Sequence, residues 1–340
     1  MRTAVLRLSA LGDVAMAVPV VWSAAVRNPQ VQFTVVTQPW LCALYEGLAP
    51  NVTTHPCHPH AKHKGMQGMW RLARELKARG VDTVADIHDV LRTMLLRRML
   101  GLMGCRVRHI DKGRAEKRRL LRRGWTACNP LRHQTERYAD VFRALDLDCT
   151  LDFRTLPNLQ PLAAPPKPRD ARWIGVAPAA AHASKTYPEE RLHEALRLVL
   201  RHPHTALFLF GREDSVKQFA DRLHAEFPHR VHHATEFANG LREELRLMQR
   251  LDAMLSMDSG NMHLASLVGL RTVSIWGATH PAMGFLGYGG RLSDCLQSPR
   301  PCRPCTAYGA HPRCPLPYPC LTDITPCEVA EHVLRVAQEK

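Results

Sequence analysis

Short apolar runs alternate with longer helical stretches along this chain, and that alternation constrains its fold more than any other feature. In the first half, runs typical of strands lie at residues 3–8, 31–36, 52–55, 83–87 and 106–110. Helical patterns fill the intervals at residues 14–27, 66–79, 90–102 and 134–145. Strands that alternate with helices predict a parallel sheet covered on both faces.

A proline-rich stretch then interrupts the alternation. The segment LPNLQPLAAPPKPRDA (156–171) contains five prolines, which favour extended backbone and mark a linker. After it, strand-like runs return at residues 173–177, 206–210, 230–233, 253–256 and 272–276. Helical patterns separate them at residues 189–200, 215–226, 242–250 and 261–268.

We therefore predict an α/β chain of two Rossmann-like, doubly wound parallel-sheet domains that face each other across a cleft. Their predicted bounds are 1–156 and 172–340, joined by the linker 157–171. The second domain includes a cysteine-rich loop at 302–320 and a terminal helix. Ligands of such sheets bind at the carboxyl ends of the strands.

Charge and hydropathy limit where the protein works and what it meets. No apolar run reaches the roughly 18 residues needed to cross a bilayer. Gly12 and Asp13 split the amino-terminal apolar run, which argues against a signal peptide, so we expect a cytoplasmic protein. The net charge of +15 predicts an anionic partner or surface.

The amino-terminal motif SALGDVAMAVP (9–19) places a lone carboxylate, Asp13, after the first strand. A carboxylate there either caps the helix predicted to begin at Val14 or has a catalytic or binding role. Gly12 predicts a tight turn beside it. The sequence alone leaves both roles of Asp13 open.

The sharpest motif is LSMDSGNMHLASLVGLRTVSIWGATHP (255–281). A strand ends at Asp258, Ser259 and Gly260 form a turn, and a helix carrying His263 begins. Exposed N–H groups at a helix start, a hydroxyl and a glycine make a site for an anion. The alternative is that Asp258 or Ser259 only caps the helix and that His263 is a satisfied helix residue.

Two further motifs follow strands of the second half. VAPAAAHASKTYPEERL (176–192) has Lys185 and then Tyr187 and Pro188 at a helix start, and LFLFGREDS (207–215) brings Glu213 after a strand. Glu213 is either a ligand group or a solvated acid favoured by the dipole of the next helix.

Taken together, these four motifs resemble signatures of glycosyltransferase family 9, the lipopolysaccharide heptosyltransferases. The resemblance implies the GT-B fold, with the acceptor bound by the first domain and the nucleotide-sugar by the second. It also implies inverting transfer without a catalytic metal or a cofactor. The family's usual Trp is Tyr187 here, and Ala180 and Ala181 replace hydroxyl residues of some members.

The same resemblance implies roles for individual residues. Asp13 is the expected catalytic base, and the expected acceptor-binding residues are Ser9, Gly12, His133 and Arg137. The expected donor-binding residues are Lys185, Glu213, Asp258, Ser259, Gly260 and His263. The implied partners are ADP-heptose and a lipid A–core acceptor at the cytoplasmic face of the inner membrane, and no nucleic acid. One alternative is an enzyme of the same fold that transfers a sugar from another nucleotide-sugar to another glycan. The other is a protein that binds a nucleotide-sugar without catalysing transfer.

The segment DKGRAEKRRLLRRG (111–124) explains much of the positive charge, since seven of its residues are Lys or Arg. Its apolar periodicity is too weak for a packed helix, so we expect a solvated loop. In a heptosyltransferase-like fold it would lie on the acceptor side and meet acceptor phosphates. The rival hypothesis is a nucleic-acid-binding protein, although no aromatic stacking platform accompanies the charge.

Two clusters raise the question of a metal. HPCHPHAKHKG (55–65) is histidine-rich, and its prolines favour a fortuitous loop over a site. Cys302, Cys305, Cys314 and Cys320 have the spacing C-x2-C-x8-C-x5-C, which could close a tetrahedral zinc site. Zinc, a transient disulfide and free thiols all remain open for these cysteines, so a metal is not assigned.

Overall fold

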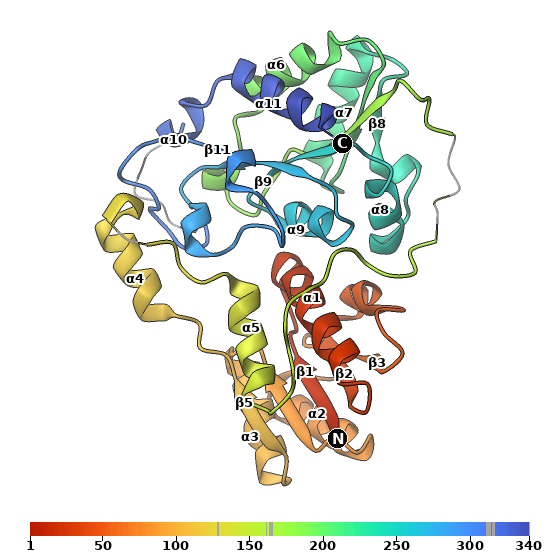
Figure 1. Ribbon diagram of the computed structural model, residues 1–340, viewed down its shortest axis with the longest axis vertical. Coiled ribbons are helices and arrows are strands. Elements are labelled where there is room, and N and C mark those ends of the chain that lie inside the picture. Colours follow the sequence, from red (N-terminus) through yellow and green to blue (C-terminus); the bar gives the residue numbers. More distant parts are fainter. Residues whose placement is uncertain (128, 161, 163–165, 311–313, 315–316, 340) are drawn as a thin grey trace. The chain divides into compact units, whose positions relative to one another are not determined.

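Two structural units make up the chain (Figure 1). The computed structural model describes residues 1–127, 129–160, 162, 166–310, 314 and 317–339. One unit comprises Met1–Lys112 and His133–Asn158, and the other comprises Gly113–Arg132 and Leu159–Lys340. Each has its own sheet and its own buried core.

A five-stranded parallel sheet, in the order β3-β2-β1-β4-β5, forms the centre of the first unit. Its strands are β1 (Arg2–Leu6), β2 (Gln32–Thr37), β3 (Val52–Pro56), β4 (Thr83–Asp86) and β5 (Arg106–His109). The helices are α1 (Leu11–Arg27), α2 (Gly65–Ala78), α3 (Leu91–Leu102), α5 (Gln134–Arg143) and the 3-10 helix η1 (Pro39–Tyr45). Helices on both faces bury the strands, which explains why β1 and β4 read as nearly continuous buried runs.

The second unit is built on a six-stranded parallel sheet in the order β11-β10-β9-β6-β7-β8. Its strands are β6 (Arg172–Ala177), β7 (Thr205–Leu209), β8 (Val231–His233), β9 (Ala253–Met257), β10 (Thr272–Trp276) and β11 (Cys295–Gln297). Its helices are α4 (Arg114–Arg123), α6 (Glu189–Leu200), α7 (Asp214–Glu226), α8 (Leu241–Met248), α9 (Gly260–Leu267), α10 (Pro319–Thr322) and α11 (Pro326–Gln338). Five 3-10 turns connect them: η2 (Trp125–Ala127), η3 (Ala183–Lys185), η4 (Ala234–Glu236), η5 (Pro281–Met283) and η6 (Leu292–Asp294).

Both sheets reverse their strand order beside the first strand. In the first unit β1 pairs with β2 on one side and β4 on the other, and in the second unit β6 pairs with β7 and β9. Such a reversal opens a crevice at the carboxyl ends of the two central strands, where doubly wound sheets bind ligands. The residues after β1 and β4, and those after β6 and β9, are therefore the ones placed for function.

The predicted succession of strands and helices is confirmed, with two local differences. Helix α1 begins at Leu11 and includes Gly12 and Asp13, so the predicted start at Val14 and the predicted tight turn at Gly12 are wrong. Strand β11 was not predicted because it has three residues, of which one is buried.

The basic segment differs most from expectation, because Arg114–Arg123 forms helix α4 instead of a loop. Its residues Gly113–Arg132 belong to the second unit, whereas the predicted first domain, 1–156, ran through them. Leu120 is fully buried with Ala282 and Met283 of the second unit. Leu120 and Lys117 are the buried residues of this helix, which explains why apolar periodicity gave no signal.

Part of two predicted segments lies outside the described residues, namely 161 and 163–165 of the linker and 311–313 and 315–316 of the cysteine-rich loop. Among the residues that the structure describes, no helix has the length and apolar character needed to cross a membrane.

Candidate active site

Asp13 lies at the crevice of the first unit and pairs with Arg7. Arg7 follows β1 and is almost completely buried, and its guanidinium forms an ion pair with the half-exposed Asp13 carboxylate. Arg7 also donates a hydrogen bond of 3.1 Å to the Ile87 carbonyl after β4. The Asp13 side chain makes no capping hydrogen bond, because Ala10 is the N-cap of α1. Its alternative role as a cap is therefore excluded, and its carboxylate is oriented by a fixed cation.

A second ion-pair network builds the end of β4. The Asp86 carboxylate is fully buried and accepts hydrogen bonds from the backbone N–H groups of His88 and Asp89, at 3.0 and 2.9 Å. Arg97 of α3 donates to both Asp86 and Asp89, each at 2.8 Å. This network fixes the loop that faces Arg7, so the crevice of the first unit is rigid where Asp13 lies.

The predicted acceptor-binding residues lie in α1 and α5 or just before them. Ser9 and Gly12 are half-buried beside Asp13. His133 is the N-cap of α5, and its Nδ1 accepts a hydrogen bond of 3.3 Å from the N–H of Thr135. Arg137 is buried in the same helix. The next residue, Tyr138, lies with its ring centroid 5.6 Å from the Arg7 guanidinium carbon, which ties α5 to the Asp13 pair.

The crevice of the second unit contains Lys185 and Asp258. The Lys185 ammonium lies 2.8 Å from Oδ2 of Asp258, and both side chains are largely buried. The hydroxyl of Thr279, after β10, donates a hydrogen bond of 2.7 Å to the same oxygen. The Asp258 carboxylate therefore holds the Lys185 ammonium in a fixed position. The lysine is the group available for an anion.

Helix α9 begins directly after this pair, at Gly260. Ser259 is its N-cap, but no side chain caps the helix, and the Ser259 hydroxyl lies 3.1 Å from that of Ser256. The capping alternative for Asp258 and Ser259 is therefore wrong. An uncapped helix start presents backbone N–H groups and the positive end of the helix dipole to an anion. His263 is buried one turn into the same helix.

Arg303, which motif reading did not single out, organises the ends of β10 and β11. It is completely buried, and burial lowers the pKa of its guanidinium. It donates to the carbonyls of Trp276, Gly277, Thr279 and Ser298, at 3.0, 2.6, 2.9 and 2.6 Å. These bonds fix the strand end that carries Thr279, and so the carboxylate that orients Lys185.

Glu213 lies at the start of α7, after β7, and is exposed. Its Oε2 accepts a hydrogen bond of 3.0 Å from the backbone N–H of Arg212, whose guanidinium pairs with Glu244 of α8 at 3.0 Å. Glu213 precedes the helix as its N-cap residue without making a capping bond, so the structure leaves its carboxylate facing solvent.

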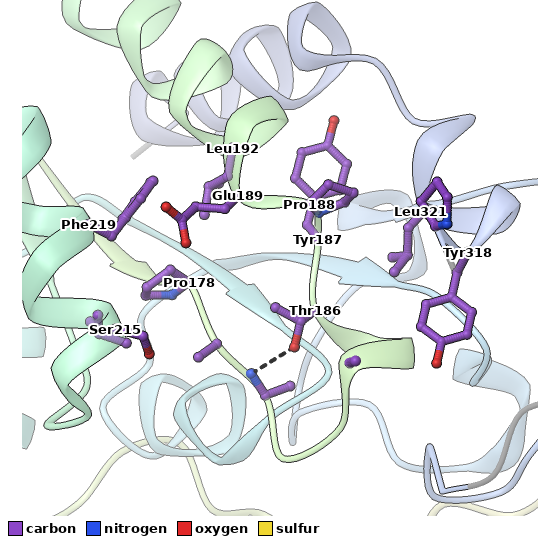
Figure 2. Close-up of a pocket in the computed structure, with 15 residues that line it drawn as sticks. Pro178, Thr186, Tyr187, Pro188, Glu189, Leu192, Ser215, Phe219, Tyr318 and Leu321 are labelled. Carbon is purple, nitrogen blue, oxygen red and sulfur yellow. Dashed lines mark hydrogen bonds between the residues drawn. The ribbon is translucent and has the colours of Figure 1, made fainter. Parts of the chain in front are cut away.

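A cavity of about 520 Å³ adjoins the turn that carries Lys185 (Figure 2). In Figure 2 the Thr186 hydroxyl accepts a hydrogen bond of 3.3 Å from the Ala180 N–H, which closes that turn. The wall is mostly apolar, with Tyr187, Phe219 and Tyr318 around the single carboxylate of Glu189. Because Lys185 and Asp258 do not line it, this cavity is separate from the charged pair.

The histidine-rich and cysteine-rich segments, for which the sequence raised the question of a metal, differ from each other in the structure. His55 and His63 lie with Nε2 at 2.8 and 3.2 Å from Oε2 of Glu75, so the histidine-rich segment is more ordered than expected. Within the described part of the chain, this is the one group of three or more His, Cys, Asp or Glu whose ligand atoms gather within 4.8 Å. Among the described residues, the thiols of cysteines 302, 305, 314 and 320 are not gathered to that distance, although those of Cys302, Cys314 and Cys320, after burial, contribute to the raised pKa of Cys305.

Buried neutral histidines make stability depend on pH. Burial, with Arg7 nearby, lowers the pKa of His88 to about 3, and burial beside Arg303 lowers the pKa of His280 to about 4. Their stabilisation is complete above the unfolded pKa near 6.5 and is lost as the pH falls toward the folded value. The contribution of each histidine to the free energy of unfolding should fall by roughly 1.4 kcal/mol per pH unit over that range.

We expect denaturant unfolding at pH 7.5, 6.0 and 4.5 to show this loss in the wild type. His280→Asn should flatten the curve, since an amide oxygen can accept the Ala282 N–H hydrogen bond that Nδ1 accepts at 3.0 Å, without titrating. Parallel curves for the two proteins would contradict this account of His280.

The chain is similar to known proteins over most of its length. The model of glycosyltransferase family 9 (heptosyltransferase) matches residues 69–312. Lipopolysaccharide heptosyltransferase 1 of Pseudomonas aeruginosa is 25% identical over 329 residues, which cover 90% of this chain and 86% of that protein.

Two solved structures have the same fold. That of E. coli ADP-heptose lipopolysaccharide heptosyltransferase II has a TM-score of 0.68 and 18% identity, and covers 100% of this chain and 99% of that chain. The structure of E. coli heptosyltransferase WaaC with ADP-2-deoxy-2-fluoro heptose has a TM-score of 0.66 and 19% identity. It covers 91% of this chain and 97% of that chain. The predicted GT-B fold class is thereby confirmed.

Proposed function

The chain belongs to glycosyltransferase family 9 and is a glycosyltransferase, and from this premise we propose that it transfers a heptose from ADP-heptose to the inner core of lipopolysaccharide. The observation that carries the proposal is the Lys185–Asp258 pair beside the uncapped start of α9, at the crevice of the second unit. A cation and free N–H groups at one point suit a diphosphate leaving group.

The leaving diphosphate gains negative charge as the bond from the sugar breaks. Lys185 and the α9 N–H groups at Gly260 stabilise that charge, and Asp258 with Thr279 holds the ammonium in place. These groups supply the charge stabilisation that a divalent cation would otherwise provide, so we propose a metal-independent reaction. Glu213 is assigned to the ribose of the donor, as a hydrogen-bond acceptor on the neighbouring strand end.

Asp13 is assigned as general base. The acceptor hydroxyl must lose its proton as it attacks the anomeric carbon, and inversion requires the attack to come from the face opposite the diphosphate. A half-exposed carboxylate held by the buried Arg7 suits that role. Ser9 and Gly12 are assigned to the acceptor because they lie close to Asp13 in the chain, and His133 and Arg137 because Tyr138 of the same helix lies against Arg7. The first unit thus binds acceptor and the second binds donor.

The substrate class is supported by the relatives. The Pseudomonas protein is a lipopolysaccharide heptosyltransferase, and one E. coli structure contains an ADP-heptose analogue. A lipid A–core acceptor carries phosphates and acid sugars, which fits a chain of net charge +15. We place the reaction in the cytoplasm, at the inner membrane face where such an acceptor is anchored.

A thermal-shift panel of nucleotide-sugars tests the donor. Binding to the native state alone stabilises by RT ln(1 + [L]/Kd), about 2.7 kcal/mol at a concentration of 100 Kd. We expect ADP-heptose to raise the melting temperature by several degrees and UDP- and GDP-sugars to leave it unchanged. A larger shift with another nucleotide-sugar would overturn the assignment of ADP-heptose.

A further inference from the structure

Helix α4 carries a dense surface of positive charge. Five exposed arginines form it, and we call it the arginine surface: Arg114, Arg118, Arg119, Arg122 and Arg123. Glu116 is the one carboxylate of the helix. Pairs such as Arg118 with Arg122 and Arg119 with Arg123 are four residues apart, a spacing at which like charges destabilise a helix.

The opposite side of α4 fixes the helix to the second unit. Leu120 is buried against Ala282 and Met283. The buried Lys117 ammonium lies 4.6 Å from the ring centroid of Phe285 and 5.7 Å from that of Tyr308. The arginines are therefore displayed on a docked helix, so their mutual repulsion is built into the folded state.

Counter-charges within the protein are lacking for part of this surface. In the described residues, Arg119, Arg122 and Arg123 form no ion pair, whereas some other arginines of the second unit do. Arg222 pairs with Glu190 at 2.8 Å, and Arg300 pairs with Asp323 at 2.6 Å. Charge complementarity therefore calls for an anionic partner from outside the chain.

A polar hollow lies at the base of the arginine surface. Its volume is about 590 Å³, and Arg119, Thr126, Asn129 and Arg132 contribute to its lining together with Glu116. Guanidinium, amide and hydroxyl groups are the donors that bind phosphate oxygens in proteins. The hollow has room for a phosphate-bearing headgroup, so the surface offers both a charged face and a place for one headgroup.

We propose that the arginine surface of α4 docks the protein onto a bilayer of anionic phospholipids. The choice of a bilayer rests on the proposed function, because a lipid-anchored acceptor is met at such a surface. Single-stranded nucleic acid fits less well, since its proteins pair basic residues with exposed aromatic rings. Near α4 the Tyr308 ring is exposed, but Lys117 already lies against it, and Trp125 is stacked on His280 with ring centroids 5.0 Å apart.

Vesicle sedimentation tests the proposal with the full chain. The wild type should bind vesicles of phosphatidylcholine containing 30 mol % phosphatidylglycerol and not vesicles of phosphatidylcholine alone. Each arginine near an anionic surface contributes roughly a fivefold factor to binding, so Arg119→Gln/Arg122→Gln/Arg123→Gln should lower the partition coefficient about a hundredfold. Added salt should weaken wild-type binding.

A matched variant removes the same charge elsewhere. Arg71, Arg74 and Arg98 are exposed helical arginines of the first unit, and replacing these three by Gln should leave vesicle binding near the wild-type level. Equal losses in the two triple variants would overturn the proposal, because net charge alone would then explain binding.

Two other results would also overturn it. One is an unchanged partition coefficient in the α4 variant combined with a raised KM for an acceptor stripped of its acyl chains, which would assign the arginines to acceptor phosphates. The other is tighter binding of the wild type to RNA or DNA than to the anionic vesicles. Vesicle binding is measured without donor or turnover, so it stands or falls separately from heptose transfer.

Discussion

Lys185→Ala should lower kcat/KM by roughly a hundredfold or more, the scale of losing one preorganised donor to a developing anion. The ammonium is held 2.8 Å from Asp258 and largely buried, so its charge acts at short range on the leaving diphosphate. Alanine also leaves the Asp258 carboxylate without its partner, and a bare carboxylate there repels the diphosphate. Steady-state assays with ADP-heptose and the acceptor measure the effect.

Lys167→Ala is the matched control. Lys167 also pairs with a buried carboxylate of the second unit, Asp252, but lies at the amino end of β6, away from the crevice. The Lys167→Ala variant should have a lower free energy of unfolding and the same kcat/KM as the wild type. Near-normal turnover in Lys185→Ala would remove Lys185 from the site, and equal losses in both variants would mean that folding and not chemistry was disturbed.

The fold was predictable because parallel strands covered on both faces have few polar positions. Strands such as β1 and β9 therefore stand out as apolar runs between helical segments. Helix α4 escaped prediction for the opposite reason. This helix packs on the second unit through the buried Leu120 and through Lys117, which lies against an aromatic ring. A lysine does not contribute to a pattern of apolar residues in the sequence.

Among the candidate site residues, some were also predictable from the sequence and others were not. Asp13, Lys185 and Asp258 follow strands within short motifs, so local sequence exposed them. Arg7 and Arg303 did not stand out, because their roles come from contacts with distant segments, such as the Arg7 bond to Ile87. In the loop at 302–320 the spacing of the cysteines drew attention, yet the residue that binds four backbone carbonyls is the arginine between two of them.

Asp13→Asn should lower kcat by a hundredfold or more, because an amide does not accept a proton and general-base losses are roughly 10²–10⁴. If Asp13 only capped the helix, Asn would leave the melting temperature unchanged, since Asn caps helices as well as Asp. The structure changes that expectation: Asp13 pairs with the buried Arg7, so the amide should also lower the melting temperature. ADP binding, assigned to the other unit, should be unaffected.

Asp146→Asn provides the control for this variant. Asp146 is an exposed carboxylate of the first unit that pairs with Arg106 at 2.7 Å. The substitution removes an ion pair that lies outside the crevice. Residue 146 has a positive φ of 62°, a backbone conformation that asparagine adopts readily. Its kcat should equal that of the wild type.

The central claim is that Asp13 is the base in a transfer of heptose from ADP-heptose. Single-turnover transfer to a lipid A–core acceptor, with enzyme in excess and donor saturating, tests it most directly. We expect heptosylated acceptor and ADP from the wild type, and a rate at least a hundredfold lower in Asp13→Asn with the same Kd for ADP. It is contradicted if the wild type transfers nothing from ADP-heptose, or if Asp13→Asn transfers within a few-fold of the wild-type rate.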